Sequence, residues 1–187
     1  MPTKSFLLDH EPHWIPARQG IHPHLPDSAQ SWIYEPGSIT QRLRSYYGDG
    51  VKVEILFLEW QAPFLSESRM LRVPAHRYAL TREVLLHVHG KPLILARTLI
   101  PERTLKAARK NLAHLGNRPL GEVIFSYPKL HRLEMDFTEA EPSVWTEAAI
   151  GTAQIDQSVW GRRTIYSIRH RQMLINEFFM PDALLLH

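Results

Sequence analysis

Short-range alternation of apolar and polar residues is the feature of this sequence that most restricts its fold. Residues 78–88 and 92–100 alternate with the two-residue period of a β-strand and are separated only by His89-Gly90-Lys91. Residues 164–169 and 173–180 flank the equally short connection His170-Arg-Gln172. Parallel neighbours need a crossover of about a dozen residues or more, so both pairs are predicted to be antiparallel hairpins.

Two further alternating runs, residues 51–57 and 129–137, predict additional strands. A helix is expected before them, because Ser38 with Gln41 three residues later fits a capping box. Gly48 should end that helix, since glycine accepts the left-handed conformation of a helix C-terminus. A mostly hairpin-linked set of about six strands with a few helices predicts the α+β class, built on an antiparallel sheet.

The segments between and around the strands carry weaker patterns. Apolar residues at helical spacing predict a helix from Thr104 to Gly116, and a short helix is expected over residues 119–125. Residues 1–31, rich in Pro and His, are interpreted as an irregular N-terminal arm with one short helix. Residues 138–159 are expected to form a loop or a helical excursion.

The length of the chain suits a single domain. With 187 residues it is long enough to bury a sizeable core, and we place the domain proper at residues 32–187, after the arm. No internal repeat or low-complexity segment divides the chain.

Three charged residues, Arg82, Arg97 and Glu177, share the parity of the apolar residues in their predicted strands. Their side chains should therefore point the same way as the apolar neighbours. A buried charge without a partner is costly, so each needs an opposite charge. Two interpretations follow for Arg82 and Glu177: a structural ion pair bridging neighbouring strands, or two groups that bind a charged ligand.

Composition excludes several classes of function. The chain has no cysteine, so it has neither disulfides nor thiolate chemistry, and no apolar run reaches the roughly 18 residues of a membrane span. A net charge of +3 without a basic tract does not favour nucleic-acid binding. The pairs His22/His24 and His87/His89 lack a third ligand at a telling spacing, so no metal site is expected. With no signal peptide evident, a cytoplasmic protein is the expectation.

Six short motifs occur in an order and at spacings that resemble the chorismate lyase family, the bacterial enzymes that form 4-hydroxybenzoate for ubiquinone. The resemblance covers residues 32–181. The motifs are Ser38-Ile-Thr-Gln-Arg-Leu43, Arg82-Glu-Val-Leu-Leu86, Gly90-Lys-Pro92 with Ala96-Arg-Thr98 and Pro101, Pro119-Leu-Gly121, Trp160-Gly-Arg-Arg163, and Glu177-Phe-Phe-Met-Pro181.

The resemblance implies a monomer with helices on one side of the sheet and two helical flaps over an internal ligand site. It implies a lyase that converts chorismate to 4-hydroxybenzoate and pyruvate without metal or cofactor. Arg82 would hold the ring carboxylate, with backbone N–H groups of Ile39 and Leu120 contacting it from the flaps. Glu177 would face the other end of the ring, near the hydroxyl and the breaking ether. Arg82 and Glu177 are thus the candidate catalytic residues.

The second carboxylate of chorismate needs its own cation. Parity makes Arg97 the first candidate, with Arg162 or Arg163 behind it. Glu177 would either accept a hydrogen bond from the hydroxyl or, if protonated, assist the departing oxygen. Elimination and concerted hydrogen transfer both remain open.

The alternative function is a binding module. Effector domains of some bacterial transcription regulators share the implied fold and would use the same pocket to sense a small acid without chemistry. Turnover of chorismate would indicate the lyase, and tight binding of an aromatic acid without turnover would indicate the binding module.

Overall fold

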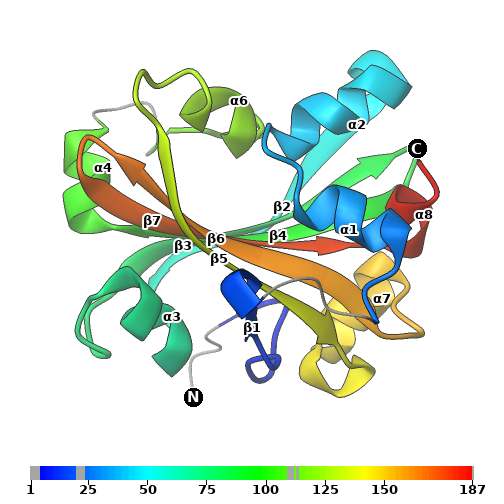
Figure 1. Ribbon diagram of the computed structural model, residues 1–187, viewed down its shortest axis with the longest axis horizontal. Coiled ribbons are helices and arrows are strands. Elements are labelled where there is room, and N and C mark those ends of the chain that lie inside the picture. Colours follow the sequence, from blue (N-terminus) through cyan, green and yellow to red (C-terminus); the bar gives the residue numbers. More distant parts are fainter. Residues whose placement is uncertain (1–4, 20–23, 109–111, 113, 187) are drawn as a thin grey trace.

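A single antiparallel sheet of seven strands forms the centre of the protein (Figure 1). In the computed structural model, residues 5–19, 24–108, 112 and 114–186 are described. The strand order is β1-β5-β6-β7-β4-β3-β2. The strands are β1 (Ile15–Pro16), β2 (Val51–Gln61), β3 (Ala79–Val88), β4 (Lys91–Pro101), β5 (His131–Ala140), β6 (Val159–Ile168) and β7 (Arg171–Phe179). The predicted α+β class is confirmed, with one strand more than the roughly six expected.

Both predicted hairpins are present, and their turns explain the short connections. His89 and Gly90, between β3 and β4, have φ of 50° and 77°, the left-handed pair that a two-residue hairpin turn requires. Arg169 and His170 make the same turn between β6 and β7, with φ of 48° and 63° and without a glycine. Strand β6 begins at Val159, earlier than the alternation indicated.

The helices are short, and all but the last, α8, come between strands in the sequence. They are α1 (Asp27–Ile33), α2 (Ile39–Tyr47), α3 (Leu65–Leu71), α4 (Glu102–Ala107), α6 (Leu120–Ile124), α7 (Glu147–Ala153) and α8 (Pro181–Leu184), with 3₁₀ turns η1 (Ala17–Gln19), η2 (Gly48–Gly50) and η3 (Pro142–Val144).

Helix α2 lies where the sequence placed it. The Ser38 hydroxyl accepts from the backbone N–H of Gln41 at 3.3 Å, and Gly48 follows the helix with φ of 55°. Helix α4 begins before Thr104, and its predicted course through residues 109–111 lies outside the described residues. The helical excursion expected in residues 138–159 is α7.

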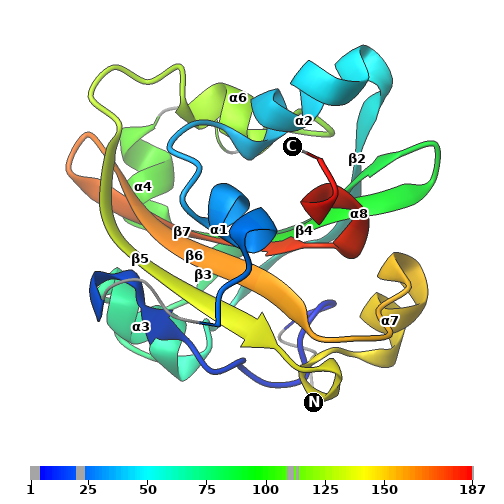
Figure 2. The ribbon, with the colours of Figure 1, turned by 45° about the vertical axis from the view of Figure 1, so that its right-hand side comes forward.

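Helices cover both faces of the sheet, which corrects the expectation of helices on one side. In Figures 1 and 2, α1, α2, α6 and α8 lie over one face, here called the pocket face, whereas α3 and α7 lie over the other, the far face. Nearly every residue of β3, β4, β6 and β7 is buried or half-buried. Strands buried on both sides need cover on both sides, and the far face receives it from α3, α7 and the N-terminal residues.

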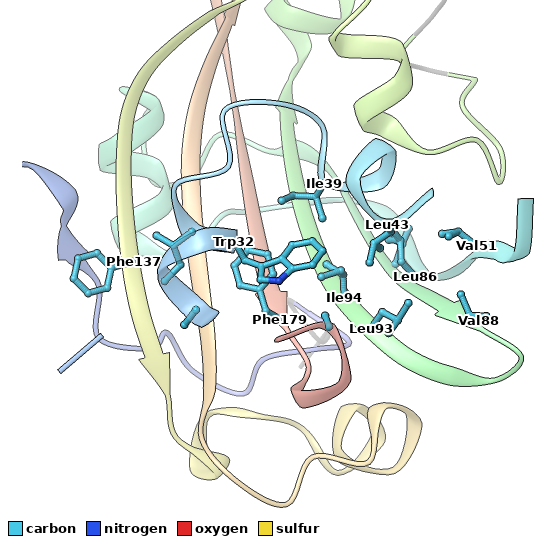
Figure 3. Close-up of a cluster of buried hydrophobic side chains, with 14 of the residues drawn as sticks. Trp32, Ile39, Leu43, Val51, Leu86, Val88, Leu93, Ile94, Phe137 and Phe179 are labelled. Atoms are coloured by element: carbon cyan, nitrogen blue, oxygen red, sulfur yellow. The ribbon is translucent and has the colours of Figure 1, made fainter. Parts of the chain in front are cut away.

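The core under α1 and α2 fixes these helices on the pocket face. Figure 3 shows Trp32 of α1 against Phe179 of β7, with ring centroids 5.9 Å apart. Leu43 of α2 lies beside Leu86 of β3 in the same cluster. Trp32 and Leu43 are fully buried, so the two helices have little freedom to shift on the sheet.

The described residues of the N-terminal arm pack against the sheet, with Leu7 and Leu8 on the far face. The Glu83 carboxylate on the far face accepts from the Ser5 hydroxyl at 2.5 Å and from the Phe6 backbone N–H at 2.6 Å. Strand β1 pairs with β5 and supplies the seventh strand. Helix α1 crosses the boundary that we expected between residues 31 and 32.

Candidate functional site

A pocket lies on the pocket face, between the sheet and the first turns of α2 and α6. Its empty volume is about 530 Å³, including space open to solvent at its mouth. The wall is mostly apolar, with a few polar side chains: Ser38, Ile39, Thr40, Val53, Arg82, Val84, Leu86, Ile94, Ala96, Thr98, Pro119, Leu120, Gly121, Ile124, Phe125, Tyr166, Ile175 and Glu177. Four of the five predicted site residues, Arg82, Glu177, Ile39 and Leu120, thus meet in one pocket.

Arg82 is a buried cation without a carboxylate partner among the described residues. Its side chain is 4% exposed, and among the described residues its guanidinium donates only to the backbone carbonyls of Gly116 at 3.2 Å and Arg118 at 3.1 Å. No described group accepts a hydrogen bond from its Nε. Burial lowers the pKa of Arg82 to about 10, so the side chain remains cationic at neutral pH. A ligand carboxylate would supply the missing charge and hydrogen-bond acceptors.

Glu177 has a different partner. Its Oε2 accepts from Nε of Arg162, directly opposite on β6, at 2.6 Å. Strand β4 separates Glu177 from Arg82, since Ala96 pairs with Glu177 and Thr98 pairs with Arg82. The interpretation of Arg82 and Glu177 as a mutual ion pair is therefore wrong. The two charges lie on different strands of one pocket, each available to a different part of a ligand.

Tyr166 was missed by the sequence analysis. It lines the pocket on the same face of β6 as Arg162, and its hydroxyl accepts from Nη2 of Arg132 at 3.2 Å. Burial raises the pKa of Tyr166, and the nearby Glu177 charge raises it further, so the phenol stays neutral. The signal available in the sequence was spacing. Tyr166 lies four residues after Arg162, and residues two or four apart share a face of a strand.

The roof of the pocket forms where α2 and α6 meet. Ile39 and Leu120 are the first residues of the two helices, positions whose N–H groups have no partner within the helix. Gly121 permits the close approach, since a Cβ built there would lie 2.6 Å from the Ser38 hydroxyl. Further along, Arg44 and Glu122 join the helices through an ion pair.

Arg97 does not reach the pocket, which corrects its assignment to the second carboxylate. Its neighbours Ala96 and Thr98 line the pocket, so Arg97 points to the far face. There it is fully buried and donates to Glu67 at 2.8 Å and to Glu83 at 2.7 Å. The prediction for Arg97 was wrong because β4 is buried on both faces. In such a strand, sharing a face with apolar residues does not show which face of the sheet carries the pocket.

The backup candidates also have partners. Arg163 points to the far face and donates to Asp136 at 2.7 Å, while Arg162 is engaged with Glu177.

In the part of the chain that the structure describes, no group of His, Asp or Glu side chains is arranged to hold a metal ion. His87 accepts from the Gly90 N–H through Nδ1. His22 lies outside the described residues. No described helix is long and apolar enough to cross a membrane.

Comparison with known proteins identifies the family. A family model described as chorismate lyase matches residues 10–185. The chain belongs to the chorismate lyase family. The match begins within the N-terminal arm and includes β1. The resemblance carried by the sequence motifs begins only at residue 32.

Relatives within the family resemble the chain over most of its length. A probable chorismate pyruvate-lyase of Methylococcus capsulatus is 40% identical over 155 residues, covering 83% of this chain and 96% of that protein. Another from Hydrogenovibrio crunogenus is 30% identical and covers 98% of both chains.

Solved structures with the same fold come from transcription regulators. A GntR-family regulator from Bacillus cereus has a TM-score of 0.56 at 11% identity, covering 72% of this chain and 94% of that one. The effector domain of PhnF from Mycobacterium smegmatis has a TM-score of 0.55 at 11% identity, covering 78% and 90%. At such identities the likeness shows the fold alone.

Proposed function

We propose that the protein is a chorismate lyase that converts chorismate to 4-hydroxybenzoate and pyruvate. The observation that carries the proposal is a pocket holding a buried arginine without a carboxylate partner, Arg82, and a carboxylate, Glu177, two strands away. This arrangement suits a ring acid with polar groups at opposite ends. Membership of the family and the names of its relatives support the activity.

Arg82 is proposed to bind the ring carboxylate with its fork of donors. Backbone N–H groups of Ile39 and Leu120 add contacts from the roof. The ligand carboxylate thereby supplies the opposite charge and the hydrogen-bond acceptors that Arg82 lacks among the described residues. The same interaction both binds the ring and orients it. The apolar remainder of the wall excludes water and fits the flat ring.

The reaction breaks the ether carbon–oxygen bond and removes the hydrogen from the adjacent ring carbon, which carries the hydroxyl. The electrons of that carbon–hydrogen bond form the third double bond of the aromatic ring, and the departing enolpyruvyl group becomes pyruvate after taking a proton on carbon. Aromatisation supplies the driving force. The protein is left to bind, orient and exclude water.

Glu177 is proposed to accept a hydrogen bond from the ring hydroxyl. Its Oε2 is occupied by Arg162, and no described group donates to Oε1. An acceptor at this position stabilises the transition state, because the hydroxyl changes from an alcohol to a more acidic phenol as the ring aromatises and its hydrogen bond to the carboxylate then strengthens. Stepwise elimination and concerted transfer both use this contact.

The test follows both products. Purified protein is mixed with chorismate in chelator-treated buffer, and 4-hydroxybenzoate and pyruvate are quantified together. Equimolar release supports the lyase. Tight binding of 4-hydroxybenzoate without turnover would contradict it and favour the acid-sensing alternative, which the shared fold of the regulator domains supports.

The resemblance also implies a setting for this activity. We propose a monomer acting in the cytoplasm, without cofactor, at the entry to ubiquinone biosynthesis. Size-exclusion chromatography coupled to light scattering tests the first of these points.

A further inference from the structure

We propose that Arg162 is a positioning residue that holds Glu177 and the base of α2 in one fixed arrangement. The proposal rests on the proposed lyase function, because Arg162 would act through Glu177. Arg162 does not itself line the pocket, although it is adjacent to it. Its side chain is 1% exposed, which makes it one of the most deeply buried charges of the protein.

The first half of the argument is the contact with Glu177. The two residues are directly opposite in register on β6 and β7, and the Nε–Oε2 distance is 2.6 Å. Cross-strand partners on one face lie close enough to restrict each other's rotamers. A carboxylate in a mostly apolar wall would otherwise be free to turn and would carry an unmatched charge. Arg162 thus fixes both the direction and the charge balance of Glu177.

The second half is the contact with the backbone that leads into the roof. Nη1 of Arg162 donates to the carbonyl of Glu35 at 2.7 Å and to that of Ile33 at 3.1 Å, with Trp32 at 3.4 Å. These carbonyls end α1 and begin the link to α2, where a cation is favourable. One guanidinium therefore joins Glu177 to the segment that sets the position of Ser38 and the first turn of α2.

Arg132 repeats this arrangement from β5. Its Nη2 donates to the same Glu35 carbonyl at 2.9 Å and to the hydroxyl of Tyr166 at 3.2 Å. Glu35 also accepts from the Gly37 N–H through its own carboxylate at 2.9 Å, which shapes the short link. Two pocket groups are thus tied to one carbonyl at the base of α2. This recurrence argues that the arrangement belongs to the site and is more than incidental packing.

The charges around Glu177 make Arg162 its main partner. The ionisable groups that face it are Arg162 and Tyr166 on β6, with Arg132 behind Tyr166 and Arg82 across β4. The lining residues of α2 and α6 are not ionisable. Removing Arg162 removes the only one of these cations in direct contact with the carboxylate. Glu177 would then lose its fixed direction and its charge partner, so the reaction should suffer more than binding.

The experiment compares Arg162→Met with Arg163→Met. Arg163 is the next residue on the same strand, is 7% exposed and has its own ion pair with Asp136, but it points to the far face. We expect both variants to lose thermal stability. Only Arg162→Met should lower kcat, by about 10²-fold, with a smaller change in KM. Arg162→Lys, which keeps the charge and loses the fork, should fall between wild type and Arg162→Met.

A double variant separates positioning from general damage. If Arg162 acts through Glu177, Arg162→Met added to Glu177→Gln should lower kcat little further. Two results would overturn the proposal: a wild-type kcat in Arg162→Met, or equal kinetic losses in Arg162→Met and Arg163→Met. Should the wild-type protein bind 4-hydroxybenzoate without turning over chorismate, the lyase proposal fails separately. The inference is then judged by whether Arg162→Met, and not Arg163→Met, weakens that binding.

Discussion

Replacing Arg82 by methionine should weaken the ligand complex while making the free protein more stable. Arg82 is 4% exposed, donates only to two carbonyls in the described structure and has an unpartnered Nε. Burial lowers its pKa from the usual value to about 10, which corresponds to a cost of ~3 kcal/mol for keeping the cation in the folded protein. Methionine is of similar length, flexible and uncharged, so it fills the space without that cost.

The two expected effects have opposite signs. Losing the hydrogen bonds to the Gly116 and Arg118 carbonyls lowers the free energy of unfolding by about 1 kcal/mol each, which offsets part of this gain. The net gain in the free energy of unfolding is then ~1 kcal/mol, or a rise in Tm of about 2–4 °C. Binding moves the other way: losing the partner of a buried carboxylate costs ~2–5 kcal/mol, which is about 30-fold or more in Kd.

Calorimetric titration with 4-hydroxybenzoate and thermal unfolding with and without it measure both effects. Wild-type protein should gain more Tm from the ligand than Arg82→Met does, although the variant starts higher. Arg82→Lys is the control, since it keeps the charge, and it should bind with intermediate affinity. Destabilisation of the free Arg82→Met protein together with wild-type affinity would refute the reasoning and make Arg82 a structural residue.

Three further substitutions test other parts of the site. Glu177→Gln should lower kcat by about 10²-fold in turnover assays. Calorimetry should show a change of less than ~10-fold in the Kd of 4-hydroxybenzoate. Equal losses of kcat and of affinity would contradict a role in the reaction. Gly121→Ala should weaken binding by ~1 kcal/mol because its Cβ would lie 2.6 Å from the Ser38 hydroxyl, and adding Ser38→Gly should restore affinity. Arg97→Met should cost ~3–5 kcal/mol in urea unfolding by leaving two buried carboxylates unmatched. The folded Arg97→Met fraction should keep wild-type affinity, and a large loss of affinity would return Arg97 to the site.

The strands and hairpins were predictable because their signals are local. Alternation over six to eleven residues and a connection too short for a crossover define an antiparallel pair without reference to the rest of the chain. The cap of α2 is equally local, since Ser38 and Gly48 satisfy the helix ends themselves. The seventh strand was not predictable: β1 has two residues and exists only because β5 is there to pair with it.

The site was predictable only in part because parity relates residues within one strand and says nothing about the other strands. Arg82 and Arg97 have the same relation to their apolar neighbours, yet they lie on opposite faces. The pocket face is determined by α2 and α6, whose positions depend on long-range packing. The Arg162–Glu177 pair required the register of β6 against β7, which the hairpin turn fixes but alternation alone does not.

The charges of the pocket bear on whether this fold serves here as an enzyme or as a sensor. A sensor of small acids needs a cation, and Arg82 supplies one; a carboxylate nearby would only repel an anionic ligand. Glu177 is nevertheless present in the wall, and Arg162 balances its charge from just outside the pocket. The repulsion is thereby reduced while the acceptor oxygen remains. A half-buried carboxylate together with a buried arginine that orients it is hard to explain by binding alone, since an apolar pair would hold an aromatic acid as well at less cost in desolvation. This pair is expected where an acceptor must act on the ligand, and it favours the lyase.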